Sequence, residues 1–171
     1  LHQVGLARDH VLGAALARSD MMVITGAGGG IMAAAHEGAG LEHSLGFNIT
    51  LPFEQHANPT VQGTANLLPF HFFFTRKLFF VKEADALVLC PGGFGTLDEA
   101  LEVLTLIQTG KVKSFPVILF GRAYWEGMVE WLSRTVAGAG NIDAADLTLF
   151  HVTDDPEEAV RIVLDARSRR A

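Results

Sequence analysis

The stretch ALVLCPGGFGTLDEALEVLTLIQTG, residues 86–110, contains the pattern that decides the fold. Residues 86–90 are all apolar, as expected of a strand buried on both faces. The Pro-Gly-Gly-Phe-Gly segment at 91–95 is typical of a loop. Over residues 96–109 apolar side chains recur at helical spacing, and a glycine follows as a stop signal. This stretch therefore predicts a strand, a glycine-rich loop and a helix in direct succession.

The same alternation continues along the rest of the chain. We predict strands over residues 21–25, 45–50, 67–72, 116–120 and 147–152, helices over 4–18, 31–41, 76–83 and 123–136, a loop over 52–66, and a closing helix capped by Asp155. Apolar strands that alternate with amphipathic helices predict an α/β fold, a Rossmann-like doubly wound parallel sheet with helices on both faces. The length predicts a single domain, 1–171. Because the chain opens on a helix and lacks an initial Met, we expect it to be missing an N-terminal strand.

The composition excludes several classes of protein. Hydrophobic residues make up 49% of the chain and charged residues 19%, which excludes intrinsic disorder. With 13 basic and 19 acidic residues, the net charge of −6 argues against nucleic acid as a partner. No apolar run is long enough to span a bilayer, so we expect no membrane partner. The single cysteine fits a reducing, cytoplasmic location.

Seven of the 18 glycines gather in two loops that each follow a strand and open a helix. The first is residues 25–30, Thr-Gly-Ala-Gly-Gly-Gly, and the second is residues 91–96. In α/β sheets such loops lie at the carboxyl ends of the strands, where ligands bind, and exposed amides there attract anions. Neither loop has the Lys of a P-loop. Gly28, Gly30 and Ala33 fit a dinucleotide fingerprint, but the acid expected about 20 residues later is absent, which disfavours a dinucleotide. A phosphate-bearing ligand remains the preferred interpretation.

Three side chains near these loops have two interpretations each. Glu99 either forms a capping box with Thr96 or serves as a catalytic carboxylate in the first turn of the helix. Arg76 either pairs with a nearby carboxylate or faces a phosphate or a leaving group. His36 is interpreted as a surface residue of its helix, with an approach to the first glycine loop as the alternative.

Several segments resemble the Lonely Guy family of cytokinin riboside 5′-monophosphate phosphoribohydrolases. The resemblance is carried by FTRK at 74–77, the complete P-G-G-x-G-T-x-x-E motif at 91–99, and LTLIQTG at 104–110. The segment at 48–55 is most similar to the longer, type II members. The first loop departs from the family pattern at three positions, Ala27, Gly29 and Ala33. Some relatives carry the older label lysine decarboxylase, but no pattern here supports a pyridoxal phosphate site.

The resemblance implies hydrolysis of the N-glycosidic bond of a nucleoside 5′-monophosphate, AMP-like or N6-modified, to a free base and ribose 5-phosphate. It implies a homodimer or a larger homo-oligomer, and we expect no cofactor and no metal. The natural base stays open, as does the role of Glu99 as nucleophile or base. The alternative is a non-catalytic carrier of a nucleotide or of molybdenum cofactor. The resemblance assigns catalysis to Arg76 and Glu99, and substrate binding to Gly28, Gly29, Gly30, Lys77, Gly92, Gly93, Gly95 and Thr96.

Overall fold

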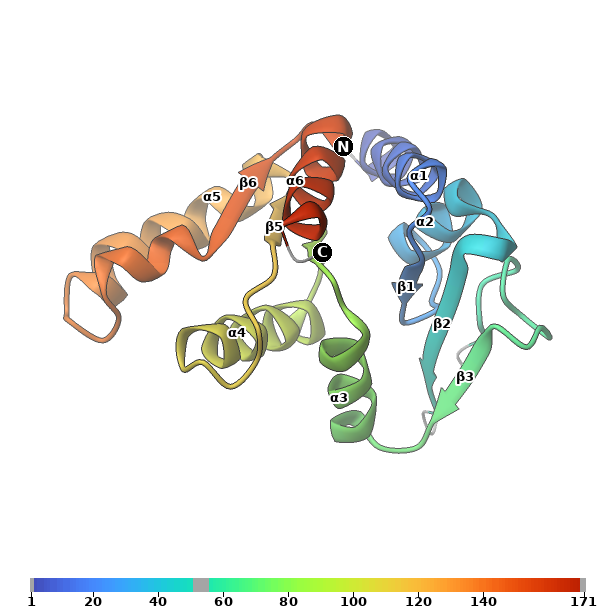
Figure 1. Cartoon of the computed structure of the whole chain (residues 1–171), viewed down its shortest axis with the longest axis horizontal. Coiled ribbons are helices and arrows are strands. Elements are labelled where there is room, and N and C mark those ends of the chain that lie inside the picture. The colour runs from blue at the N-terminus through green and yellow to red at the C-terminus, as the bar shows by residue number, and fades with distance from the viewer. Residues whose placement is uncertain (1, 51–55, 170–171) are drawn as a thin grey trace. The chain divides into compact units, whose positions relative to one another are not determined.

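The computed structural model describes residues 2–50 and 56–169, with the side chains of 2–5 left aside. The chain folds as two compact units, 1–83 and 84–171, and each is described by itself. Figure 1 shows the helices and strands of both. Residues 51–55, which include the start of the predicted loop and part of the type II segment, lie outside the described residues.

The first unit is a three-stranded parallel sheet with three α-helices. Its strands are ordered β1-β2-β3, with Val23 opposite Ser44 and Gly46 opposite Leu67. The predicted elements are present with small shifts of their ends, and the largest shift is at α3, which begins three residues earlier than expected. The elements are α1 (His2–Arg18), β1 (Val23–Thr25), α2 (Ile31–Ala39), a 3-10 turn (Leu41–His43), β2 (Ser44–Ile49), β3 (Leu67–Phe70) and α3 (Phe73–Glu83).

Helices α1 and α2 lie side by side because two glycines let their backbones touch (Figure 1). A Cβ atom added at Gly13 would lie 2.1 Å from the carbonyl oxygen of Ala35, and one added at Gly38 would lie 2.0 Å from that of His10. Both distances are far below van der Waals contact. Only glycine at these two positions permits this helix–helix packing.

Four phenylalanine rings attach α3 to the sheet. Phe47 of β2 is 2% exposed, and its ring centroid lies 5.4 Å from that of Phe70 and 5.1 Å from that of Phe80. Phe79 also packs on Phe70, at 5.4 Å. Aromatic pairs at these distances add to the stabilisation that comes from area burial. The cluster fixes the position of α3, which carries Arg76.

The second unit is also a three-stranded parallel sheet, ordered β4-β5-β6. Every residue of β5 is buried, in agreement with its uninterrupted apolar sequence. Trp125 is fully buried, and its indole N–H donates to the carbonyls of Leu89 (3.0 Å) and Phe120 (3.2 Å), at the ends of two neighbouring strands. The elements are β4 (Leu87–Leu89), α4 (Phe94–Gln108), β5 (Val117–Phe120), α5 (Arg122–Trp131), a π-helical turn (Leu132–Ala137), a 3-10 turn (Ala144–Thr148), β6 (Phe150–Thr153) and α6 (Pro156–Ser168).

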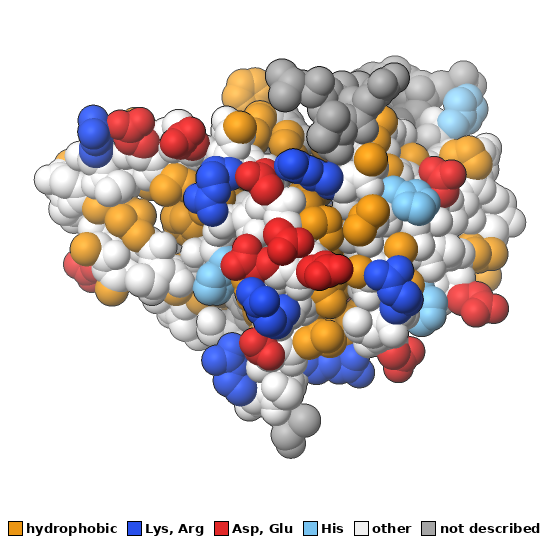
Figure 2. Space-filling view, turned by 90° about the horizontal axis from the view of Figure 1, so that it is seen from above, with side chains coloured by type: hydrophobic (Ala, Val, Ile, Leu, Met, Phe, Trp, Pro, Cys, Tyr) orange, Lys and Arg blue, Asp and Glu red, His pale blue; other side chains and the backbone are white. Residues whose placement is uncertain are grey.

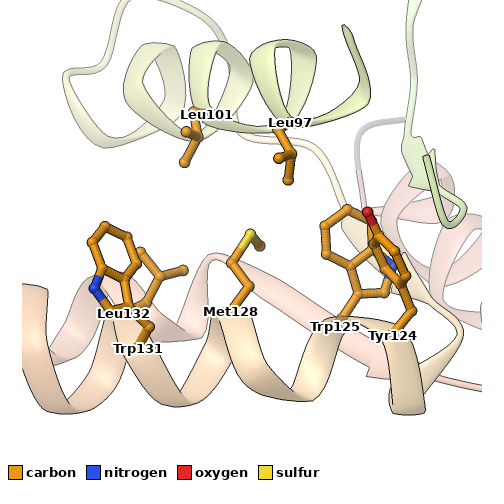
Figure 3. A pocket seen from close by; sticks show the side chains of 7 residues that line it. All are labelled: Leu97, Leu101, Tyr124, Trp125, Met128, Trp131 and Leu132. Atoms are coloured by element: carbon orange, nitrogen blue, oxygen red, sulfur yellow. The ribbon is translucent and has the colours of Figure 1, made fainter. Parts of the chain in front are cut away.

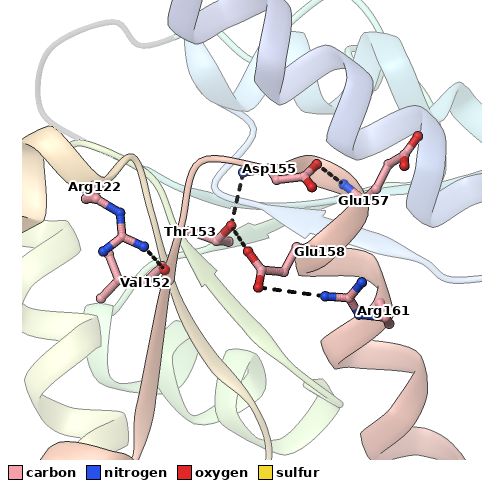
Figure 4. A network of polar contacts seen from close by, with 7 residues as sticks. All are labelled: Arg122, Val152, Thr153, Asp155, Glu157, Glu158 and Arg161. Atoms are coloured by element: carbon pink, nitrogen blue, oxygen red, sulfur yellow. Dashed lines mark hydrogen bonds and ion pairs between the residues drawn. The ribbon is translucent and has the colours of Figure 1, made fainter.

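The predicted cap of the closing helix is confirmed. Asp155 is the N-cap of α6, and its carboxylate accepts a hydrogen bond from the N–H of Glu157 at 2.9 Å. Thr153 supports the turn: its hydroxyl accepts from the N–H of Asp155 at 3.0 Å and donates to the carboxylate of Glu158 (Figure 4). A strand end and a helix start are thus joined by side-chain hydrogen bonds.

Parallel strands that alternate with helices confirm the predicted α/β class. The strand pairings of the described residues form two three-stranded sheets, one in each unit. None of the helices in the described part of the chain combines the length and hydrophobicity that crossing a bilayer requires. Figure 2 shows acidic and basic side chains interleaved on the face that it displays.

Replacing Gly13 by Ala is expected to destabilise the protein, although Ala normally stabilises a helix interior by about 1 kcal/mol relative to Gly. The added methyl group would overlap the backbone of α2, so we expect the free energy of unfolding to fall by about 1–3 kcal/mol. Urea denaturation followed by circular dichroism measures this. Gly127→Ala, an exposed helical site with open space around it, is the matched control and should be neutral or stabilising. Equal effects at both sites would contradict the packing.

Replacing Asp155 by Ala is expected to lower the free energy of unfolding by about 1 kcal/mol, because the helix loses its N-cap. Asp165→Ala, which removes an exposed carboxylate near the other end of the same helix, is the control for the change in charge. If both variants are equally stable, the cap contributes nothing.

Candidate functional site

The first glycine loop, residues 26–30, lies in the first unit between β1 and α2. Gly30 is the N-cap of α2 with φ of 64° and makes no side-chain cap. Ala27 has φ of 59°, a left-handed conformation that is unfavourable for a residue with a Cβ. Its side chain is fully buried against Ala57 and Val61. Packing therefore holds the loop in a conformation that the backbone alone would disfavour.

A closed ring of hydrogen bonds supports this loop from behind. The backbone N–H of Asn58 donates to the carbonyl of Ala27 (2.8 Å), and its side-chain amide donates to the carbonyl of Gly28 (3.2 Å). The same amide lies 3.2 Å from Nδ1 of His36, whose Nε2 lies 3.1 Å from the hydroxyl of Thr25. That hydroxyl accepts from the N–H of Ala27 at 3.0 Å, which closes the ring. We call it the Asn58 ring.

The ring determines which nitrogen of His36 carries the proton. The carbonyl of Gly28 can only accept, so the NH₂ group of Asn58 must face it and also donate to Nδ1 of His36. Nδ1 is then unprotonated, and Nε2–H donates to Thr25. His36 is fully buried, and this desolvation lowers its pKa below the ordinary 6.5, against the opposing effect of its hydrogen bonds with Asn58 and with backbone groups. The interpretation of His36 as a surface residue is therefore wrong.

Arg76 lies beside the first glycine loop. A Cβ atom added at Gly26 would be 3.6 Å from Nη1 of Arg76, so the guanidinium group is adjacent to the loop backbone. The group also lies over two rings of its own helix, 5.2 Å from the centroid of Phe73 and 5.8 Å from that of Phe80. These cation–π contacts orient the side chain. Lys77 follows on α3 and is partly buried.

The second glycine loop lies in the second unit, between β4 and α4. Helix α4 begins at Phe94, with Gly93 as its N-cap, so the predicted capping box of Thr96 and Glu99 is wrong. Thr96 instead folds back over Gly92, where an added Cβ would lie 2.1 Å from its hydroxyl oxygen. Gly92 must therefore be glycine. Its carbonyl accepts a hydrogen bond from the hydroxyl of Tyr124.

Glu99 lies in the second turn of α4, on the same face as Thr96, because residues three apart on a helix are neighbours. The side chain is half-buried, whereas that of Asp98 is exposed. Glu102, three residues further along this face, has one carboxylate oxygen buried. Glu99 and Glu102 thus form a partly buried acidic face that starts at the glycine loop.

An apolar cavity of about 430 Å³ lies between α4 and α5 (Figure 3). Leu97 and Leu101 of α4 point into it, toward Met128 and the other lining side chains. Since residues two apart on a helix are separated by about 200°, these leucines lie opposite Glu99. The cavity is therefore on the other side of α4 from the acidic face. Its remaining lining residues are Tyr124, Trp125, Trp131 and Leu132.

The predicted site residues thus form two groups. In the first unit the structure brings Arg76 to the loop that contains Gly28, Gly29 and Gly30. In the second unit it brings Glu99 to the helix face of Thr96, at the loop of Gly92, Gly93 and Gly95. Across residues 2–50 and 56–169, no group of three or more His, Cys, Asp or Glu side chains could hold a metal ion.

Sequence reasoning missed Asn58 and Glu102. Nothing in the sequence distinguishes Asn58 within its loop, because its partners are carbonyl groups brought near it only by folding. Glu102 belongs to no motif, and its three-residue spacing from Glu99, which places both on one face, is the signal that could have found it.

Comparison with known proteins gives consistent results. A family model described as "Possible lysine decarboxylase" matches residues 29–163. A probable cytokinin riboside 5′-monophosphate phosphoribohydrolase of Oryza sativa subsp. japonica is 28% identical over 91% of this chain and 67% of its own length. The cytokinin riboside 5′-monophosphate phosphoribohydrolase of Mycobacterium marinum is 31% identical over 50% of this chain and 46% of its own. The X-ray structure of TM1055 matches 96% of this chain and 88% of its own, with a TM-score of 0.60 and 26% identity.

The lowered pKa of His36 predicts a pH-dependent stability. The unfolded chain takes up a proton on His36 near pH 6.5, whereas the folded protein does so only at a lower pH. This contribution to stability is present above pH 6.5 and is lost as the pH falls toward the folded pKa. We expect the free energy of unfolding to fall more between pH 7.5 and 5.5 in the wild type than in His36→Asn. His151→Gln, at an exposed site, is the control and should behave as the wild type.

Proposed function

Since the chain belongs to the family described as "Possible lysine decarboxylase", and the relatives above are named phosphoribohydrolases, we propose that it is a phosphoribohydrolase. In the proposed reaction, water and an AMP-like or N6-modified adenine nucleoside 5′-monophosphate give the free base and ribose 5-phosphate. One C–N bond breaks, the anomeric carbon gains the hydroxyl group of water, and the departing base takes the proton.

One observation carries this proposal. The complete P-G-G-x-G-T-x-x-E motif forms a strand-to-helix loop whose Gly92 is covered by Thr96, and Glu99 projects from the same helix face as Thr96. Backbone amides at the start of a helix suit a phosphate. A carboxylate one turn away suits a positive charge that develops on the ribose rather than the phosphate itself, which it would repel.

Each predicted residue has a chemical role in the proposed mechanism. The N-glycosidic bond breaks through an oxocarbenium-like state, and Glu99 stabilises that cation and then either activates water or attacks the anomeric carbon. Arg76 stabilises negative charge on the departing base or the phosphate. In this mechanism the second loop, with Gly92, Gly93, Gly95 and Thr96, binds the phosphate. The first loop, with Gly28, Gly29 and Gly30, binds another part of the nucleotide, and Lys77 adds a second cation.

The family description names a different reaction, the decarboxylation of lysine. That chemistry needs an electron sink such as pyridoxal phosphate, bound through a lysine Schiff base. The features of this chain that support a ligand are two glycine loops, an arginine and a carboxylate, and this set suits a nucleotide better.

Replacing Glu99 by Gln is expected to lower kcat for base release at least about 100-fold, because the carboxylate charge is lost while the shape is kept. The measurement is chromatography of the free base released from AMP and from N6-isopentenyladenosine monophosphate. Asp98→Asn, at the exposed neighbouring position, is the matched control and should keep kcat within about twofold.

Two outcomes would contradict the proposal. If the wild type binds these nucleotides tightly but releases no base, the chain is a carrier, as in the alternative. If Glu99→Gln releases base as fast as the wild type, another group performs the reaction.

A further inference from the structure

We propose that Asn58 is a positioning residue for nucleotide binding: it holds two carbonyls of the first glycine loop so that the amides that follow them point away from Asn58, and the exposed Gly29 presents its amide to the ligand. This inference rests on the proposed function, which makes the loop part of the substrate site. Asn58 itself touches no substrate in this proposal, and acts only through the loop.

The planarity of the peptide bond fixes where the amides of the loop point. In a trans peptide the C=O of one residue and the N–H of the next point in opposite directions. Asn58 donates hydrogen bonds to the carbonyls of Ala27 and Gly28, at 2.8 and 3.2 Å, so both carbonyls point toward it. The N–H groups of Gly28 and Gly29 therefore point away from Asn58. Among the described residues, no backbone carbonyl accepts from either of these two N–H groups.

The side chain of Asn58 is held in one orientation. Asn58 is 3% exposed, and its NH₂ group donates both to Gly28 and to Nδ1 of His36. A flipped amide would place its oxygen against the carbonyl of Gly28 and lose that bond. The observed orientation leaves Oδ1 buried without a hydrogen-bond partner among the described residues. Leaving a polar atom in this state is costly, so the two donated bonds define the arrangement.

The first glycine loop is exposed over only part of its length. Ala27 and Gly28 are buried, whereas Gly29 and Gly30 are exposed, so the loop is packed over its first half and open from Gly29 onward. The guanidinium group of Arg76 lies next to the same loop at Gly26. Amide donors with a cation beside them suit a ligand group rich in acceptors, such as the phosphate, ribose or adenine of a nucleotide. The orientation set by Asn58 thus bears on affinity more than on the chemical step.

Asn58→Asp tests this inference, because it keeps the size and the backbone N–H but replaces the donor that faces Gly28 by an oxygen. We expect KM for AMP to rise about tenfold, the effect of losing roughly one oriented hydrogen bond to a charged ligand, with kcat changed less than threefold. Calorimetric titration with ribose 5-phosphate should show a similar loss of affinity without turnover.

Ser44→Ala is the control for a merely structural effect. Ser44 is fully buried in the same unit, and its hydroxyl donates to the backbone carbonyls of His36 and Gly40, so it contacts His36 through the main chain and not through the imidazole. This variant should lose stability yet keep KM within about twofold. If Ser44→Ala raises KM as much as Asn58→Asp, the effect is general destabilisation and the inference is wrong.

A milder pair of variants covers the case in which Asn58→Asp fails to fold. Thr25→Val removes the hydroxyl that accepts from His36 and Ala27, whereas Thr25→Ser keeps it. We expect Thr25→Val to raise KM and Thr25→Ser to restore the wild-type value. Equal KM values for the two variants would overturn the inference.

Nitrogen chemical shifts of the histidines, measured by NMR, provide a readout independent of activity. The wild type should show His36 with its proton on Nε2, and a proton on Nδ1 would contradict the ring. If the wild type neither binds nor hydrolyses AMP or N6-isopentenyladenosine monophosphate, the proposed function fails. If it hydrolyses AMP and Asn58→Asp leaves KM unchanged, only the positioning role fails.

Discussion

The backbone carbonyls of each glycine loop need hydrogen-bond donors, and residues from other segments of the same unit supply them. In the first unit the backbone N–H and the side-chain amide of Asn58 donate to the carbonyls of Ala27 and Gly28. In the second unit the hydroxyl of Tyr124 donates to the carbonyl of Gly92. The indole N–H of Trp125 donates to the carbonyl of Leu89, the last residue of β4. Buried polar groups of the backbone are almost always paired in this way. Because a trans peptide points its C=O and N–H in opposite directions, the N–H that follows each held carbonyl points away from the donor.

The elements of the fold could be predicted because their signals are local. A strand such as β5 is apolar throughout, and the cap at Asp155 lies next to the helix that it starts. Glycine loops are equally local, since the residues that need glycine are neighbours in sequence. The start of α4 was misplaced because Gly93 caps the helix through its backbone, whereas Thr96 has the side chain that is typical of a cap.

The support of the site could not be predicted because it depends on contacts between distant segments. His36 and Asn58 are 22 residues apart, and neither has a sequence signature. An alanine-rich helix with one histidine gives no sign that the histidine faces inward. The position of Arg76 was likewise hidden, since it depends on aromatic packing that fixes α3 on its sheet. The two catalytic candidates were found through a resemblance, and the structure gives each its surroundings within its own unit.

The burial of Trp125 has a consequence for spectroscopy. The only tyrosine and both tryptophans of the chain, Tyr124, Trp125 and Trp131, belong to the second unit. Intrinsic fluorescence excited at tryptophan wavelengths therefore observes that unit alone, with one enclosed indole and one that is 53% exposed. The first unit contains phenylalanine as its only aromatic fluorophore, so its loss of structure is nearly invisible to this method. Unfolding curves from fluorescence and from circular dichroism would coincide only if the two units unfold together.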